Sequence, residues 1–137
     1  MSFSNEFLYD FKPVYEGILM AKDVKPERAV VEVIDEEQEG AGMFEPAGAL
    51  EVLEQIGDDV NTLTIYTDRA AYFGEFVETM YEKNGLVSLI VSKKRLGLAK
   101  KTVGCSSIFL FDFEWNSAFY EKQIALGKHY IPIHKRA

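Results

Sequence analysis

Two short apolar runs flank one amphipathic segment near the middle of the chain. The runs, Thr62 to Thr67 and Leu86 to Val91, are rich in the β-branched residues that favour strands. The segment between them, Arg69 to Lys83, carries glutamates on one side and repeats apolar residues at helical spacing, namely Phe73, Phe76, Val77 and Met80. The pattern predicts a strand–helix–strand unit over Asn61 to Arg95. Because the connection is long enough for a crossover helix, we expect the two strands to be parallel.

The ends of the predicted helix carry their own signals. Asp68 precedes it, and a short carboxylate there accepts hydrogen bonds from the free N–H groups of a first helical turn. Asn84 and Gly85 follow it and tolerate left-handed backbone geometry, which commonly ends a helix. The next run, Leu86 to Val91, is almost wholly apolar, as expected for a strand covered on both faces.

Residues 1–28 are interpreted as an N-terminal arm that packs on the body. The first part is too apolar for a free tail, with Phe3, Phe7, Leu8, Tyr9 and Phe11. Pro13 suits the first turn of a short helix, because its missing N–H costs nothing there. The residues expected on the inner face of that helix are Val14, Ile18, Leu19 and Ala21. A strand over Gly17 to Val24 is the alternative, and the helix is preferred.

Two more elements are predicted between this arm and the central unit. Ala29 to Asp35 has the composition of a strand, with Glu32 as its charged interior residue. An unpaired buried charge is costly, so we expect this strand to lie near an edge of the sheet. Pro46 opens a predicted helix, and the residues expected on its inner face are Leu50, Leu53 and Ile56.

The chain after Val91 is predicted to form a loop with at most a short helical turn. A strongly aromatic strand follows over Ser106 to Phe113, with Ile108 and Leu110 on one face and the phenylalanines on the other. Asn116 is a fair cap for a helix over Ser117 to Leu126. A final strand is predicted over His129 to Ile133, at an edge because Pro132 cannot donate a ladder hydrogen bond.

Strands and helices therefore alternate, which predicts a single α/β domain over residues 1–137. The expected architecture is a three-layer sandwich around a mainly parallel sheet of about five strands, Rossmann-like or flavodoxin-like in the broad sense. A chain of 137 residues is most simply one such domain.

Composition narrows the class of protein. Apolar content of 47% and charged content of 27% are ordinary for a globular domain. The longest apolar run falls far short of the roughly 20 residues that a membrane span needs, so no membrane partner is expected. The N-terminus shows no basic-then-apolar leader, and the one cysteine, Cys105, excludes an intramolecular disulfide. We therefore expect a cytoplasmic protein.

The net charge of −7 argues against sequence-independent binding to nucleic acid, which depends on neutralising phosphates. This charge is spread unevenly. Glu32 to Glu45 contains six carboxylates and no base, whereas Lys93 to Lys101 contains five bases and no acid. The basic run is the part of the chain that would most readily accept an anion. The aromatic-rich N-terminal arm could form the interface of a homodimer, so a homodimer is one of the states that we consider.

The candidate site follows from the predicted parallel sheet, because ligands of open parallel sheets bind beyond the carboxyl ends of the strands. Polar residues follow each predicted strand, although loops at strand ends are commonly polar for structural reasons alone. Asp35 to Glu37 follow the first strand. The candidate ligand-binding residues follow the others and are Asp68, Arg69, Ser92, Lys93, Lys94, Arg95, Asp112 and Glu114.

Three further signals are too weak to predict a cofactor or a metal site. Gly40 to Glu45 resembles a dinucleotide-binding loop, but Glu45 replaces the third glycine and nearby carboxylates would repel a pyrophosphate. Cys105 precedes a strand, at the end of the sheet opposite the usual catalytic edge, so a small interior residue is favoured over a nucleophile. His129 and His134 lack a further ligand at metal-binding spacing. The sequence thus indicates no particular cofactor.

Two hypotheses of function result. The first is a non-catalytic α/β domain that binds a partner protein or a small anionic ligand at the carboxyl edge of the sheet, in the positive field of Arg69, Lys93, Lys94 and Arg95. The alternative is a small hydrolase or transferase acting on a phosphorylated or nucleotide-like substrate. That enzyme would use Asp68 and Asp112 as acid–base or metal-binding groups, with Glu114 on the same side of the strand as Asp112.

Overall fold

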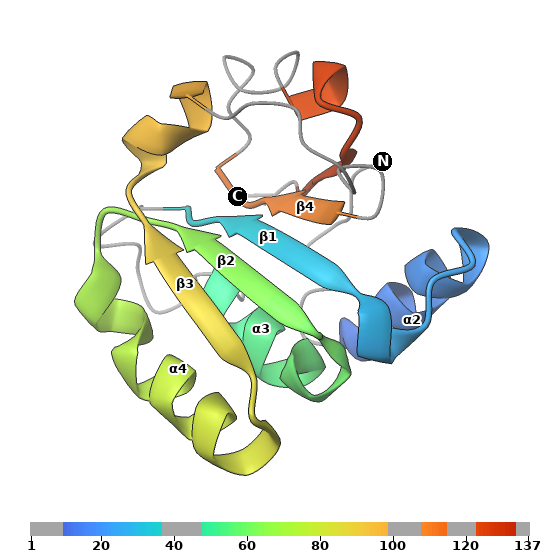
Figure 1. The fold of residues 1–137 in the computed structure, drawn as a ribbon, viewed down its shortest axis with the longest axis horizontal. Helices are drawn as coiled ribbons and strands as arrows, with labels where there is room; N and C mark the ends of the chain where they lie inside the picture. The colour runs from blue at the N-terminus through green and yellow to red at the C-terminus, as the bar shows by residue number, and fades with distance from the viewer. Residues whose placement is uncertain (1–9, 37–47, 99–107, 115–122, 134–137) are drawn as a thin grey trace.

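The computed structural model describes residues 10–36, 48–98, 108–114 and 123–133 (Figure 1). These residues contain one sheet of five strands in the order β3-β2-β1-β4-β5, and every neighbouring pair is parallel. The strands are β1 (Val30–Ile34), β2 (Thr62–Tyr66), β3 (Val87–Val91), β4 (Ile108–Asp112) and β5 (His129–Pro132). The predicted α/β class and the parallel sheet are confirmed.

Helices and loops cover both faces of the sheet. On one face, the main apolar cluster contains residues of α2 (Lys12–Ala21), α3 (Ala49–Ile56) and α4 (Ala70–Asn84). On the other face, Leu96 of the 3₁₀-helix η3 (Lys93–Leu98) packs with a smaller cluster made of Ile34, Tyr66 and Leu110. The sheet is thus the middle of three layers. Among the described residues, no helix is both long and apolar enough to cross a membrane.

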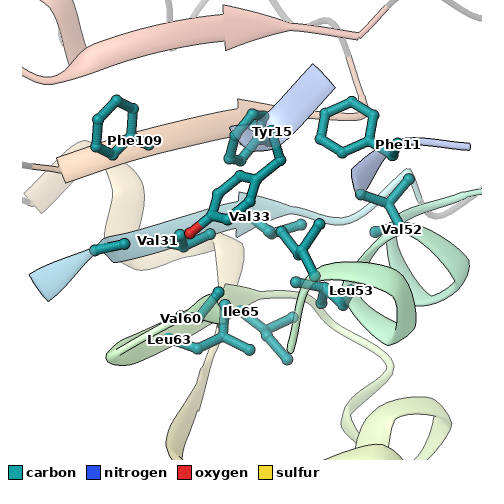
Figure 2. Packing of buried hydrophobic residues seen from close by; sticks show 14 of the residues in the cluster. Phe11, Tyr15, Val31, Val33, Val52, Leu53, Val60, Leu63, Ile65 and Phe109 are labelled. Atoms are coloured by element: carbon teal, nitrogen blue, oxygen red, sulfur yellow. The ribbon is translucent and has the colours of Figure 1, made fainter. Parts of the chain in front are cut away.

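The main core forms where α2 and α3 pack on the middle of the sheet (Figure 2). Phe11 and Tyr15 are fully buried, and Phe11 meets Phe111 of β4 edge to face with ring centroids 5.6 Å apart. The hydroxyl of Tyr15 donates to the backbone carbonyl of Asp59 at 2.9 Å, so its polar atom is satisfied. The expected packing of the N-terminal arm is therefore confirmed for Phe11. Residues 1–9 of the arm lie outside the described part of the chain.

α2 confirms the predicted short helix and excludes the alternative strand over residues 17–24. Pro13 lies in its first turn, as the sequence indicates. Tyr15 and Leu19 form its buried side, with Val14 and Ile18 partly buried beside them. Ala21 is exposed rather than buried, because it is the last residue of the helix.

β1 lies at the centre of the sheet, so the expectation that Glu32 would place it near an edge is wrong. The side chain of Glu32 is buried, but Lys128 Nζ lies 2.6 Å from Glu32 Oε1. Lys128 precedes β5 and is separated from Glu32 by 96 positions in the sequence. A cation paired in this way allows a carboxylate in a central strand. Burial, together with the charge of Glu32, raises the pKa of the Tyr66 phenol to about 12.

β3 lies at an edge of the sheet, so the expectation of cover on both faces is wrong for this strand. Ile90 packs against the main cluster on the side of α4. Val87 and Leu89 point to the opposite face, because side chains alternate along a strand, and they are 57% and 60% exposed. An apolar run predicts a buried strand, but a strand at the edge of a sheet has a neighbour on one side only and is therefore less buried. β5 is the other edge, as Pro132 predicted.

The ends of α4 follow the sequence signals only in part. Gly85 adopts left-handed geometry with φ of 68° at the end of the helix, as predicted. At the other end Arg69 is the N-cap residue, and no side chain caps the helix. The capping prediction for Asp68 is wrong because its carboxylate accepts a hydrogen bond from Ser92 Oγ at 3.0 Å instead.

The remaining predictions fall partly within the described residues. β4 has the predicted faces, with Phe109 and Phe111 in the main cluster and Leu110 in the smaller one. The helix predicted to begin at Pro46 is described from Ala49, and Leu53 and Ile56 are buried in it. Of the helix predicted over 117–126, the structure describes residues 123–126, and residues 123–125 are helical. Outside the described residues lie the glycine-containing loop at 40–45, Pro46, Cys105, Asn116 and His134.

Candidate functional site

The carboxyl ends of the five strands meet at one edge of the sheet, because all the strands are parallel. From β1 the chain builds β2 and β3 on one side and then β4 and β5 on the other. The position between the ends of β1 and β4 is thus the topological switch point, where ligands of open parallel sheets usually bind. The predicted residues lie along this edge and are Asp68, Arg69, Ser92, Lys93, Lys94, Arg95, Asp112 and Glu114.

A buried ion pair joins the ends of β1 and β2. Asp35 directly follows β1 and is 0% exposed. Arg69 Nε donates to Asp35 Oδ2 at 2.6 Å, and Arg69 Nη2 donates to Asp35 Oδ1 at 2.8 Å. Thr67 Oγ1 also donates to Asp35 Oδ2, at 2.7 Å. The two-point geometry matches the fork of a guanidinium to a carboxylate, which is the stronger form of this interaction.

These contacts keep Asp35 ionised. Burial by itself raises the pKa of Asp35, but hydrogen bonds from Arg69 and Thr67 lower it, and so do the charges of Arg69 and Lys93. The result is a pKa below the usual value for an aspartate. The hydrogen bond to Asp35 in turn raises the pKa of Arg69. At neutral pH Asp35 is therefore a fixed anion and is poorly suited to act as a general acid.

Glu36 extends the ion pair to the start of α3. Its carboxylate accepts hydrogen bonds from the backbone N–H of Ala49, at 2.9 Å to Oε2 and 3.3 Å to Oε1. Arg69 Nη2 lies 3.1 Å from Glu36 Oε1. Gly48 leaves room for this approach, since a Cβ added there would lie 2.2 Å from Glu36 Oε1. Glu36 thus does for α3 what a capping side chain at position 48 would otherwise do.

The guanidinium group of Arg69 also stacks on an aromatic ring. Its guanidinium carbon lies 4.0 Å from the centre of the Tyr72 ring, in the first turn of α4. Tyr72 remains 43% exposed. Arg69 is thus fixed by two carboxylates and one aromatic ring. Arg69 was one of the four bases predicted to create a positive field at this edge, but Asp35 and Glu36 already neutralise its charge.

Lys93 is compensated in the same way. Its Nζ forms an ion pair with Glu114, and the Lys93 side chain is only 8% exposed. Lys93 follows β3 and Glu114 follows β4, so the pair passes over the ends of β2 and β1 between them. The burial of Leu96 on the same side of the sheet holds η3 in the position that this contact requires. The ion pair of Lys93 and Glu114 therefore crosses the topological switch point between β1 and β4.

Asp68 and Asp112 lie on strands that are not neighbours. β1 separates β2 from β4, which places these strands about 10 Å apart. The carboxylate of Asp68 bonds to Ser92, beyond β3, whereas Asp112 accepts a hydrogen bond from the hydroxyl of Tyr130 on β5. The two carboxylates therefore turn away from each other. Among the described residues, no group of three His, Cys, Asp or Glu side chains is arranged to hold a metal.

Lys94 and Arg95 differ from the other two bases. Both are exposed, and within the described part of the chain neither forms an ion pair. Their backbone is held at the start of η3, where Ser92 Oγ accepts from the N–H of Lys94 at 3.3 Å and Ser92 O from that of Arg95 at 3.0 Å. These two side chains are the part of the predicted positive field that faces solvent.

Sequence reasoning identified the edge but missed several of its members. Asp35 and Glu36 were visible as acids after a strand, and their position alone could have placed them in the site. Tyr72 and Tyr130 carried no local signal, because each reaches the site through a fold-dependent contact. Comparison of the chain with family models, curated proteins and solved structures gives no significant match.

Proposed function

We propose that this chain is a non-catalytic binding domain and that the carboxyl edge of its sheet binds an anionic group. The observation that carries the proposal is the division of the four bases at this edge. Arg69 and Lys93 are locked in ion pairs, whereas Lys94 and Arg95 are exposed beside them and unpaired within the described residues. A fixed framework that presents two solvent-facing cations suits recognition of an anion, because little ordering is needed on binding.

An acidic segment of a partner protein is the form of this ligand that we favour. Lys94 and Arg95 lie on an open surface, as is usual for contacts at the rim of a protein interface. Arg69 and Tyr72, residue types enriched among the dominant contacts of interfaces, lie at the same edge. A small anionic ligand is the other form and would use the same two cations.

The hydrolase or transferase hypothesis gains no specific support. Asp35 is ionised and bound to Arg69, so it has no proton to donate near neutral pH. Asp68 and Asp112 turn toward opposite sides of the sheet, toward Ser92 and Tyr130. Acid–base catalysis and metal binding both need such groups to converge on one reacting atom.

Chemical-shift mapping tests the proposal. ¹⁵N-labelled protein is titrated at low ionic strength with a hexaglutamate peptide and, separately, with inorganic phosphate. The expected result is a saturable shift of amides over residues 92–96 and little change at the amides of Glu27 and Arg28, near the amino end of β1. Shifts with phosphate alone would favour a small ligand over a protein segment. Equal shifts at both ends of the sheet, or none, would overturn the proposal.

Matched charge reversals sharpen this test. The double variant Lys94→Glu/Arg95→Glu removes the exposed cations, and Lys25→Glu/Arg28→Glu makes the same change in net charge at exposed residues near the amino end of β1. Lys93 is left intact, because a glutamate there would face Glu114 and disturb the fold. Only the first variant is expected to abolish the mapped shifts.

A further inference from the structure

The two edges of the sheet differ in their protection against pairing with another chain. β5 contains Pro132, which cannot donate a ladder hydrogen bond. β3 reads Val-Ser-Leu-Ile-Val, without charge, proline or glycine, and is the outermost strand in Figure 1. Exposed edge strands normally carry such residues to prevent intermolecular pairing. β3 therefore has the composition of a strand that another chain covers.

The backbone of β3 has hydrogen-bonding groups that face away from the sheet. The carbonyl of Val91 accepts a hydrogen bond from the N–H of Thr67, at the end of β2, at 2.9 Å. Backbone groups alternate in direction along a strand, so Val87 and Leu89 also turn theirs toward β2. The N–H and C=O groups of Ser88 and Ile90 consequently point outward.

The surface of α4 beside this edge is uncharged. Tyr72 and Lys83 line the groove between α4 and α3, which identifies the side of α4 that faces the middle of the sheet. Residues at helical spacing on the other side are small or apolar apart from one phenol, and they are Ala70, Gly74, Val77 and Tyr81. Tyr81 is 62% exposed. β3 and this side of α4 together form the β3 strip.

We propose that the β3 strip is the interface of a homodimer in which β3 pairs, antiparallel, with β3 of a second copy. The twofold axis passes beside Leu89, so Leu89 lies opposite Leu89 and Ser88 lies opposite Ile90 of the second copy. The outward backbone groups of Ser88 and Ile90 then form about four intermolecular hydrogen bonds. Leu89 falls in a non-hydrogen-bonded pair, where side chains approach most closely.

The absence of charge on the β3 strip favours a second copy of this chain as its partner. A twofold axis brings the strip against itself, so any charge at its centre would meet its own sign. The β3 strip has none, although the chain has 22 acidic and 15 basic residues. Strips of about 17 Å of strand and about 22 Å of helix bury on the order of 1,000 Å² in the two copies together, which is at the lower end of the range for specific interfaces.

Sedimentation velocity of the full chain over a wide range of protein concentration tests this interface. The wild-type chain is expected to form a dimer and no larger species. Leu89→Lys places two ammonium groups against each other at the axis and is expected to weaken the dimer at least tenfold. Met20→Lys is the matched control, because Met20 is 81% exposed on α2, away from the strip. It should leave the dimer unchanged.

A mixing experiment tests the register independently of folding. Leu89→Lys and Leu89→Glu are each expected to be monomeric, and their mixture is expected to recover a dimer, because opposite charges then meet at the axis. Amide hydrogen exchange at Ile90 should be slow in the dimer and fast in either variant alone. A wild-type monomer at every concentration, a dimer unaffected by Leu89→Lys, or a mixture that stays monomeric would overturn the proposal. Its outcome is independent of anion binding at the carboxyl edge.

Discussion

Asp35 and Arg69 form a two-point ion pair across the ends of β1 and β2, with Nε and Nη2 of the arginine 2.6 and 2.8 Å from the carboxylate oxygens. The carboxylate is 0% exposed and the arginine side chain 26%. Removing either partner leaves the other charge poorly compensated, so Asp35→Asn or Arg69→Met is expected to lower the free energy of unfolding by about 3 kcal/mol. A double-mutant cycle in urea should give a coupling energy of about 2 kcal/mol.

The exposed pair Lys12–Asp59 is the control for this cycle. Its charged atoms lie 3.5 Å apart, and the two side chains are 42% and 26% exposed. Water screens such a pair, so its coupling energy should stay below about 1 kcal/mol. A coupling between Asp35 and Arg69 no larger than that of the control would contradict the role assigned to the buried pair.

The same ion pair predicts a particular dependence of stability on pH. The pKa of Asp35 is lower in the folded chain than its usual value of about 3.9. Its contribution is thus fully present above about pH 4 and is lost as the pH falls through the lower, folded-state pKa. Asp35→Asn lacks this contribution at every pH. Urea unfolding should therefore show a gap between wild type and variant that is constant from pH 7 to about pH 4 and shrinks below it.

Gly48 is expected to tolerate no side chain without loss of the Glu36 contacts. In Gly48→Ala the new Cβ would lie 2.2 Å from Glu36 Oε1, so the carboxylate must leave Ala49 and Arg69. The loss of a helix cap of this kind costs about 1 kcal/mol. Gly17→Ala is the control, since its Cβ meets nothing within 4 Å in the middle of α2, away from the β3 strip.

Gly17→Ala should raise the free energy of unfolding by about 0.5–1 kcal/mol, because glycine is a poor helix residue. Thermal or urea unfolding measures both variants. An increase for Gly48→Ala would show that Glu36 does not need the space that the glycine leaves.

The buried pair of Glu32 and Lys128 predicts a strongly non-additive result. Lys128→Met leaves an uncompensated carboxylate in the central strand and should cost about 3–5 kcal/mol. The double variant Glu32→Leu/Lys128→Met removes both charges and should regain most or all of that loss. Urea unfolding of the single and double variants measures the difference. Equal losses in both would mean that the methionine packs poorly, independent of any charge.

Local patterns predicted the elements of the fold well. Helical spacing located α4, the left-handed residue Gly85 located its end, and alternation assigned the two faces of β4. Pro132 placed β5 at an edge. Each of these features depends on residues close together in the sequence, which is why the sequence alone sufficed.

Two of the wrong expectations, those for Glu32 and Asp68, share one physical cause, which is an interaction with a residue distant in the sequence. Glu32 is central because Lys128, 96 positions away, pairs with it. Asp68 does not cap α4 because Ser92 binds its carboxylate. The candidate site is less positive than predicted for the same reason, because Arg69 and Lys93 are paired with acids at the ends of other strands. No local pattern encodes such partners.

We propose that Lys94 and Arg95 make the carboxyl edge of the sheet an anion-binding surface. The most direct measurement is the affinity of a fluorescent hexaglutamate peptide for the wild type and the two charge-reversal variants, at an ionic strength of about 0.1 M, where the Debye length is about 10 Å. Lys94→Glu/Arg95→Glu is predicted to weaken binding about tenfold, since two attractive contacts become repulsive. Lys25→Glu/Arg28→Glu should change it less than about twofold, because those residues lie beyond a Debye length from the edge at moderate salt. Equal weakening in both variants would contradict this proposal, because the change in net charge alone would then explain the loss of affinity.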